Sequence, residues 1–201
     1  MNILQIDSSV TGAKSVSRPL TRETAARLLA NHHDAKVVYR DLIGEPLSHY
    51  TAVIRLLGDD NPALTPDQKQ ELATGKDILA EFLAADVVVV GAPMYNFNIP
   101  SQLKAWIDLI CVSGVTFKYG ANGPEGLCGS KRVIVVSSRG GLYGPGSNNE
   151  KSDFQETYLK TVFGFIGITD VTIIRAEGVA SGPEKAAEVI AAAQQQIATL
   201  A

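Results

Sequence analysis

The sequence of 201 residues lacks several features that mark whole classes of protein. Its two cysteines, Cys111 and Cys128, have neither CxxC spacing nor metal-binding companions, so we expect no metal site and two idle thiols in a reducing compartment. No run approaches the roughly 18 apolar residues that cross a bilayer, so no membrane span is expected. Segment 1–7 has no basic stretch ahead of an apolar run, so we expect no signal peptide and a cytoplasmic location.

The sequence also lacks a strong excess of one charge. Its 18 Lys and Arg residues against 21 Asp and Glu residues give a net charge of −3, and no basic stripe occurs, which argues against a nucleic-acid partner. The signatures GxGxxG, the P-loop and Gly-x-Ser-x-Gly are missing as well. These absences argue against a Rossmann dinucleotide cradle, a nucleoside triphosphatase and a serine hydrolase.

The most informative feature that is present is a run of four valines, Val87–Val90, which stops in Gly91-Ala92-Pro93. Such a run is typical of a parallel strand that is buried on both faces. Pro100 then opens a helical pattern. The loop Met94-Tyr95-Asn96-Phe97-Asn98 therefore lies at the carboxyl end of a central parallel strand, the edge where open α/β sheets bind ligands.

Predicted strands and helices alternate along the chain. The strands are predicted at 2–6, 36–40, 86–91, 132–138 and 171–176, and the helices at 17–31, 66–84, 101–112, 154–166 and 183–200. This alternation predicts one α/β domain over residues 1–201, a doubly wound five-stranded parallel sheet in the flavodoxin-like order 2-1-3-4-5 with helices on both faces. The loops after the first, third and fourth strands then share the ligand-binding edge.

The loop after the first strand, residues 7–17, contains four serines, a threonine and a glycine just before a helix. Hydroxyl groups and unpaired N–H groups at a helix N-terminus suit a phosphate. The alternative is that Ser15 or Ser17 only caps the helix.

The two other loops suit a flat heterocycle. Residues 94–98 offer aromatic and amide side chains; the alternative is that Tyr95, Phe97 and Trp106 are core aromatics. Gly140 and Gly141, after the fourth strand, allow a close approach of backbone N–H groups to a ligand; the alternative is a flexible surface loop. A phosphate, a linker and a planar heterocycle together describe FMN.

Five segments of the chain resemble bacterial FMN-dependent NADH-azoreductases and NADH:quinone reductases. The segments are 92–99, 114–119, 122–127, 137–141 and 164–171. The resemblance implies a flavodoxin-like homodimer whose second subunit helps close the substrate site. It implies that the FMN phosphate is bound by Ser9, Ser15, Val16 and Ser17, that the isoalloxazine ring is bound by Met94, Tyr95, Asn96, Phe97, Ser138, Arg139, Gly140 and Gly141, and that the substrate side is lined by Tyr119 and Phe165.

The same resemblance implies an oxidoreductase that moves two electrons from NADH or NADPH to quinones and cleaves aromatic azo compounds. Because FMN carries the reactive atom, no catalytic side chain is predicted. Without a separate nicotinamide site, donor and acceptor are expected to use the same flavin face in turn, by a ping-pong mechanism. The alternative is a flavodoxin-like electron carrier that turns over no small molecule of its own.

Overall fold

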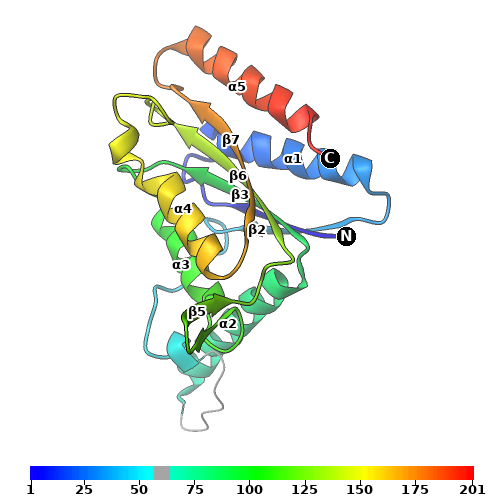
Figure 1. The fold of residues 1–201 in the computed structure, drawn as a ribbon, viewed down its shortest axis with the longest axis vertical. Helices are drawn as coiled ribbons and strands as arrows, with labels where there is room; N and C mark the ends of the chain where they lie inside the picture. The colour runs from blue at the N-terminus through cyan, green and yellow to red at the C-terminus, as the bar shows by residue number, and fades with distance from the viewer. Residues whose placement is uncertain (57–63) are drawn as a thin grey trace.

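The computed structural model describes residues 1–56 and 64–201, in which strands and helices alternate as the sequence predicts (Figure 1). The sheet strands are β1 (Asn2–Asp7), β2 (Lys36–Asp41), β3 (Val87–Pro93), β6 (Arg132–Arg139) and β7 (Asp170–Glu177). The helices are α1 (Ser17–Asn31), α2 (Pro66–Ala84), α3 (Ser101–Ile110), α4 (Phe154–Phe165) and α5 (Pro183–Ala198). Short 3₁₀ turns cover Gly12–Lys14, Ile54–Leu56 and Glu150–Ser152.

The five main strands are all parallel and stand in the order β2-β1-β3-β6-β7. This order is the predicted 2-1-3-4-5 of the main strands, so the expected fold class is confirmed. Because β1 lies between β2 and β3, the chain leaves β1 towards one side of the sheet and later returns on its other side. The loops after β1 and β3 therefore meet at the switch point of the sheet.

Helices cover both faces of this sheet. Figure 1 shows α1 and α5 side by side on one face, with α3 and α4 on the other. Val87 and Val89 pack in the cluster under α1 and α5, whereas Val88 and Val90 pack on the opposite face. The valine strand is therefore buried on both faces, as predicted. Trp106 is fully buried in the same cluster as Val88 and Val90, which confirms it as a core residue.

The start of α2 is capped by Thr65, and Pro66 occupies the first helical position. The Thr65 hydroxyl accepts from the Gln68 N–H at 3.3 Å, and the Gln68 side chain accepts from the Thr65 N–H at 2.9 Å. This reciprocal pair is a capping box, and it satisfies two N–H groups at the start of the helix.

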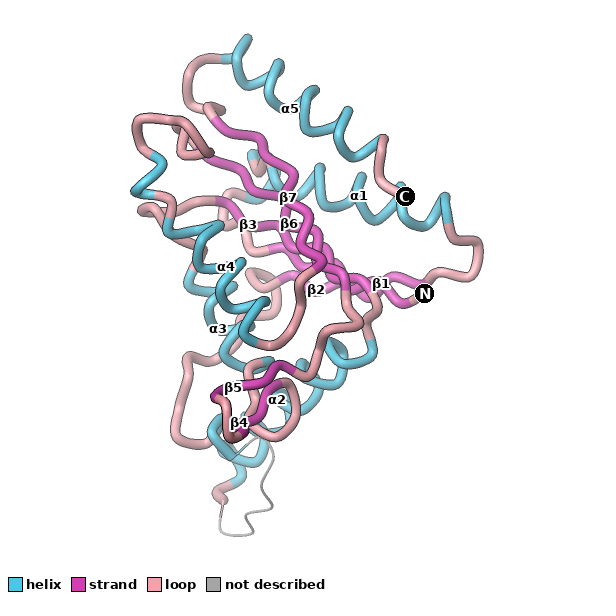
Figure 2. Tube along the Cα trace, viewed as in Figure 1, coloured by secondary structure: helices cyan, strands magenta, loops and turns pink. Residues whose placement is uncertain are grey.

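A small hairpin was not predicted. Strands β4 (Phe117–Gly120) and β5 (Gly123–Gly126) pair in antiparallel fashion between α3 and β6. Glycine and proline make up half of these eight positions, and both are depleted in strands, so the local pattern gives no strand signal. Figure 2 shows the hairpin away from the main sheet, beside the end of α4.

Candidate functional site

The loop after β1 gathers hydroxyl groups at the N-terminus of α1. Ser15 and Ser17 are buried, and their Oγ atoms lie 3.4 Å apart. The Ser15 hydroxyl also accepts from the Arg18 N–H at 3.1 Å, so the capping interpretation holds for Ser15 as well. Among the described residues, the N–H groups of Val16 and Ser17 donate to no protein acceptor. The start of α1 is therefore free to bind an anion.

Tyr95 joins the loop after β3 to the loop after β1. Its hydroxyl accepts from the Val10 N–H at 3.2 Å and lies 3.4 Å from the Oγ of Ser9. The Ser9 Oγ also lies 3.0 Å from the hydroxyl of Thr11. These contacts bring together two of the three predicted ligand loops.

Asn96 and Phe97 form the tip of a tight turn whose backbone is left-handed. The N–H groups of Tyr95 and Asn98 each donate to the other residue's carbonyl, at 2.9 and 3.1 Å. Between them the φ angles are 49° at Asn96 and 70° at Phe97. Asn tolerates this conformation, whereas in Phe it costs about 1 kcal/mol or more. The Phe97 ring is 50% exposed, so it does not belong to the core, and a strained, exposed aromatic is typical of a ligand-binding loop.

The glycine pair after β6 has its carbonyl groups bound and its N–H groups free. The Gly140 carbonyl accepts from the Ala180 N–H, and the Gly141 carbonyl accepts from the Gly178 N–H. The N–H groups of both glycines donate to no acceptor within the described chain. This loop is tied to the loop after β3, because the Met94 N–H donates to the Ser138 carbonyl at 2.8 Å.

The Arg139 side chain points into the protein. Its guanidinium is fully buried and forms ion pairs with three carboxylates, those of Asp153, Glu156 and Glu177. Its Nε also donates to the Gln155 side chain at 2.9 Å. The Arg139 carbonyl in turn accepts from the N–H groups of Gly178 and Val179, at 3.0 and 3.1 Å. No local sequence pattern predicts this network, because its members come from separate elements.

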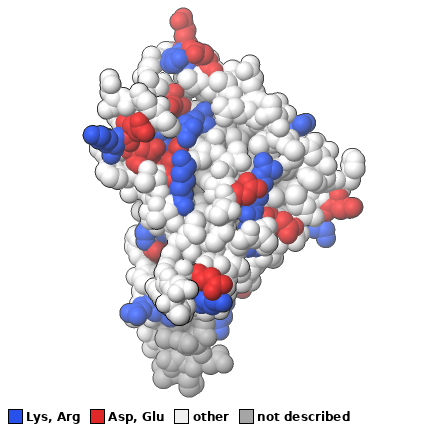
Figure 3. Space-filling view, viewed as in Figure 1, with Lys and Arg blue, Asp and Glu red and all other residues white. Residues whose placement is uncertain are grey.

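Charges of both signs lie close together on the surface above this network, over the start of α4 (Figure 3). Arg175 and the buried Glu156 form an ion pair of 2.7 Å in this region. The carboxylate of Glu156 is thus shared by two guanidinium groups, Arg175 and Arg139. The network holds the end of β6 and the start of α4 together.

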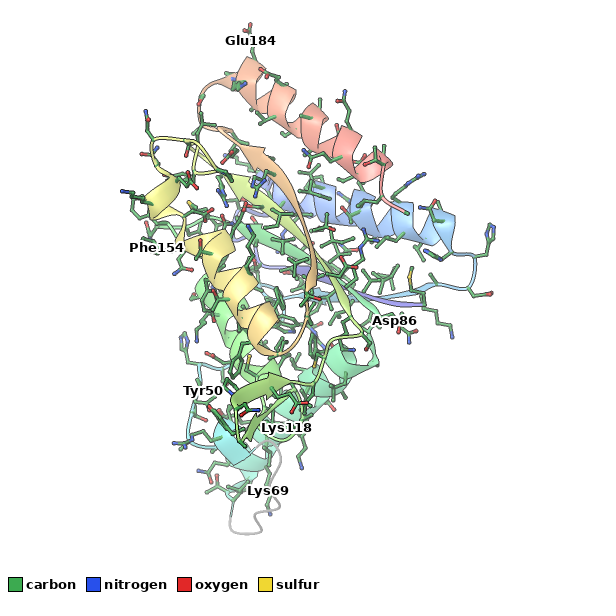
Figure 4. The ribbon with its side chains drawn as sticks, in the orientation of Figure 1. Tyr50, Lys69, Asp86, Lys118, Phe154 and Glu184 are labelled. Atoms are coloured by element: carbon green, nitrogen blue, oxygen red, sulfur yellow. The ribbon has the colours of Figure 1, made fainter. Side chains whose placement is uncertain are left out.

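The two residues predicted to line the substrate side, Tyr119 and Phe165, both pack against Phe117. Its ring centroid lies 4.6 Å from that of Phe165 and 5.6 Å from that of Tyr119. Tyr119 is 73% exposed. Phe165 is the last residue of α4 and Tyr119 lies in β4, whereas the glycine loop precedes the start of α4 at Phe154. Figure 4 shows Phe154 far from Lys118, the neighbour of Tyr119 in β4. Within one chain, α4, a helix of 12 residues and about 18 Å, therefore runs between its start at Phe154 and Phe165.

A cavity of about 500 Å³ adjoins the loop after β1 from the side of α1 and β2. Its lining includes Gln5, Asp7, Ser15, Arg22 and Tyr39. Burial raises the pKa of Asp7 against the opposing effect of hydrogen bonds from Thr21 and Tyr39. The ring-binding loops do not line this cavity, so it borders the phosphate end of the candidate site only.

Within 1–56 and 64–201, no group of three or more His, Cys, Asp and Glu side chains could hold a metal ion. No helix in those ranges is long and apolar enough to cross a membrane. Cys111 and Cys128 are both free thiols.

Three loops at the carboxyl edge of a parallel sheet in this strand order define a flavodoxin-like protein. A family described as having a flavodoxin-like fold matches residues 1–201. Two solved azoreductases share the architecture: one from Bacillus anthracis strain Sterne, with 30% identity and a TM-score of 0.89, and an FMN-dependent NADH-azoreductase from strain Ames Ancestor in complex with FMN, with 26% identity and a TM-score of 0.86. Each alignment covers 98% of this chain, and 97% and 96% of the other chain, respectively.

Relatives with higher identity are FMN-dependent NADH:quinone oxidoreductases. The protein of Methylorubrum extorquens strain PA1 is 50% identical over 200 residues, which cover all of this chain and 98% of the relative. That of Delftia acidovorans is 52% identical over 197 residues, which cover 98% of this chain and 93% of the relative. The chain therefore belongs to the family of FMN-dependent NADH:quinone oxidoreductases and azoreductases, as its motifs indicated.

Proposed function

We propose that this protein is an FMN-dependent NADH:quinone oxidoreductase that also cleaves aromatic azo compounds, and that residues 1–201 act as one flavin-binding domain. The observation that carries the proposal is 50% identity to such an oxidoreductase across the whole chain. Activity on azo compounds is supported by the azoreductase structures at 26% and 30% identity. A cytoplasmic location, where NADH is available, belongs to the same proposal.

The sheet edge fits FMN at its phosphate end. The hydroxyls of Ser9, Ser15 and Ser17 surround the start of α1, where the N–H groups of Val16 and Ser17 are free. Together they would hold a phosphate dianion through hydroxyl and N–H donors.

The ring end fits as well. The free N–H groups of Gly140 and Gly141 would donate hydrogen bonds to the polar edge of the isoalloxazine ring. They lie next to Ser138 and Arg139 in the chain. The loop of Met94, Tyr95, Asn96 and Phe97 would supply its flat contact surface. When bound, FMN supplies the redox chemistry, taking two electrons from a nicotinamide and passing them to the acceptor.

The chain itself contributes binding, orientation and electrostatic stabilisation. The glycine N–H groups are fixed by the carbonyl bonds to Gly178 and Ala180 before any substrate arrives. Dipoles held in this way stabilise negative charge that develops on a ring edge beside them. No side chain at this edge is proposed to act as an acid or a base, so the rate depends on how the reactants are positioned.

We also propose a homodimer. Tyr119 and Phe165 lie at the opposite end of α4 from the glycine loop of their own chain. They could line the substrate side only if a second subunit brings them to the flavin. Exposed apolar side chains near both ends of α4 support such an interface, with Phe97 50%, Phe154 56% and Tyr119 73% exposed.

The decisive experiment begins with the spectrum of the purified protein. Flavin absorption is expected, and the flavin released by heat should be FMN rather than FAD. NADH and NADPH are then each offered with a quinone panel and an azo-dye panel, without any partner protein. Turnover of NADH with a quinone supports the proposal, whereas flavin binding without turnover would favour the electron carrier. Colourless protein that cannot be reconstituted with FMN would overturn the proposal.

Initial rates test the order of events. Because no separate nicotinamide site is proposed, NADH and quinone should give parallel double-reciprocal lines. Converging lines would show that both substrates bind together. Sedimentation at the assay concentration tests the homodimer, and a fully active monomer would contradict it.

A further inference from the structure

Arg18 lies one residue beyond Ser17, where the hydroxyl loop joins α1. The N–H groups of its guanidinium all donate to acceptors within the protein. Nε and Nη2 donate to the carbonyl oxygen of Ser9 at 3.3 and 3.1 Å. Nη1 and Nη2 donate to the two carboxylate oxygens of Asp41 at 2.8 and 2.7 Å, and Nη1 also donates to the Tyr39 hydroxyl at 3.2 Å. These are five bonds for the five N–H groups of a guanidinium, so none is left for a ligand.

We propose that Arg18 is a positioning residue, which clamps the Ser9 peptide to Asp41 and so fixes the hydroxyl loop around the flavin phosphate without touching it. The inference rests on the proposed function, because it assumes that this loop binds FMN. Asp41 is a firm anchor, since it ends the edge strand β2 and also accepts from the Ile43 N–H at 3.0 Å. The side chains of Arg18 and Asp41 are only 18% and 29% exposed.

The clamp acts on the residue that links the two ligand loops. With its carbonyl held by Arg18, Ser9 presents its hydroxyl to Thr11 and Tyr95. The Arg18–Asp41 pair is bidentate, and a lysine cannot reproduce that geometry although it keeps the charge. Accordingly, the pKa of the Asp41 carboxyl is lowered to about 2, chiefly by the hydrogen bonds from Arg18.

The rival explanation is that Arg18 attracts the phosphate through its charge alone. Asp41→Asn separates the two explanations by the sign of its effect. A charge mechanism predicts tighter FMN binding, because a negative charge near a dianion is removed. The clamp predicts binding weaker by about tenfold, because Arg18 loses its anchor and Ser9 is released.

Two further variants complete the test. Arg18→Lys keeps the positive charge but loses the bidentate donor geometry of the guanidinium. The clamp therefore predicts that the FMN dissociation constant rises by about tenfold, whereas a charge mechanism predicts little change. Arg27→Gln is the matched control, since Arg27 lies further along α1, outside the cavity lining, donates to the Leu200 carbonyl at 3.1 Å and forms no ion pair with the described residues. The clamp predicts that it changes binding by less than about twofold.

Dissociation constants are measured by diluting the flavin-loaded proteins and following the fluorescence of released flavin, with circular dichroism as the check on folding. Riboflavin, loaded by exchange, lacks the phosphate and should be affected less than about twofold by Asp41→Asn and Arg18→Lys. Tighter FMN binding in Asp41→Asn, no loss in Arg18→Lys, or equal losses for FMN and riboflavin would each overturn the inference. Failure of the unsubstituted protein to bind FMN would instead overturn the proposed function, and the two failures are thus distinguished.

Discussion

The backbones of Gly126 and Gly167 cross so closely that a β-carbon on Gly126 would overlap the backbone nitrogen of Gly167. Gly167 has a φ of 95°, in the region that glycine favours. This crossing fixes the hairpin against the end of α4, where Phe117 meets Phe165. The position of Tyr119, one of the two residues proposed to line the substrate side, therefore depends on a contact that only glycine allows.

Gly126→Ala is expected to destabilise the protein by more than about 2 kcal/mol, because two backbone segments must separate. Gly120→Ala is the control in the same hairpin, since the nearest atom to its added β-carbon lies 3.7 Å away, an ordinary contact. It should change stability by less than about 0.5 kcal/mol. Urea denaturation measures both, and equal effects would show that the crossing does not constrain the hairpin.

Phe97 offers a test of backbone strain. At most exposed positions glycine is less stable than alanine by about 0.5–1 kcal/mol. At Phe97, with its φ of 70°, the order should reverse, so that Phe97→Gly is more stable than Phe97→Ala by about 1 kcal/mol. Urea denaturation of the two flavin-free variants gives the comparison, and Asn98, which lies outside the left-handed region, is the control. Alanine being the more stable at both positions would contradict the assignment of strain.

Glu177→Gln is expected to loosen the loop after β6. One carboxylate oxygen of Glu177 accepts from the N–H groups of Tyr143 and Gly144, at 3.0 and 2.9 Å, and pairs with Arg139. Charge-assisted bonds are roughly twice as strong as neutral ones, so hydrogen exchange at those two amides should accelerate by about tenfold. Glu188→Gln, which breaks an exposed pair with Lys185, is the control. Unchanged exchange at Tyr143 and Gly144 would mean that the loop holds its shape without Glu177.

The lowered pKa of the Asp41 carboxyl is expected to make the free energy of unfolding depend on pH in the acid range. Its pKa is lowered from 3.8 to about 2 in the folded protein, so its charged form stabilises the fold above 3.8, and this contribution is lost as the pH falls towards 2. The difference in unfolding free energy between the unsubstituted protein and Asp41→Asn should therefore shrink between about pH 5 and pH 2. The pKa of Asp7 is raised, so its contribution to the unfolding free energy depends on pH in the opposite sense. Because Asp7 is present in both proteins, this contribution cancels in the difference. A difference that stays constant over this range would refute the assignment.

The two cysteines are expected to be unreactive in the native state. Burial raises the pKa of the Cys111 thiol to about 11, and Cys128 is 3% exposed. At about pH 8 only about one Cys111 thiol in a thousand is ionised, and the thiolate is the reactive form. A colorimetric thiol reagent should therefore titrate both thiols only after unfolding. Rapid reaction of one thiol in the folded protein would identify it as exposed.

The sequence alone determined the sheet and its ligand edge. The valine run at 87–90 and the alternation of strands and helices are local patterns, and the rules for parallel sheets convert them into one strand order. The same rules placed the loops after β1, β3 and β6 at one edge. The roles of individual site residues there came from the family resemblance and stay proposals, which flavin-binding measurements test.

Only the tertiary structure decided where the charged side chains point and which backbones touch. Arg139 was predicted as a flavin ligand, yet its guanidinium is held by Asp153, Glu156 and Glu177. Arg18 and Asp41 come from different elements, and nothing in their local sequence pairs them. Hydrophobic periodicity reports which face of an element is buried, because that depends on neighbours a few residues away. An ion pair or a glycine crossing depends on the distance between elements, which exists only once the chain has folded.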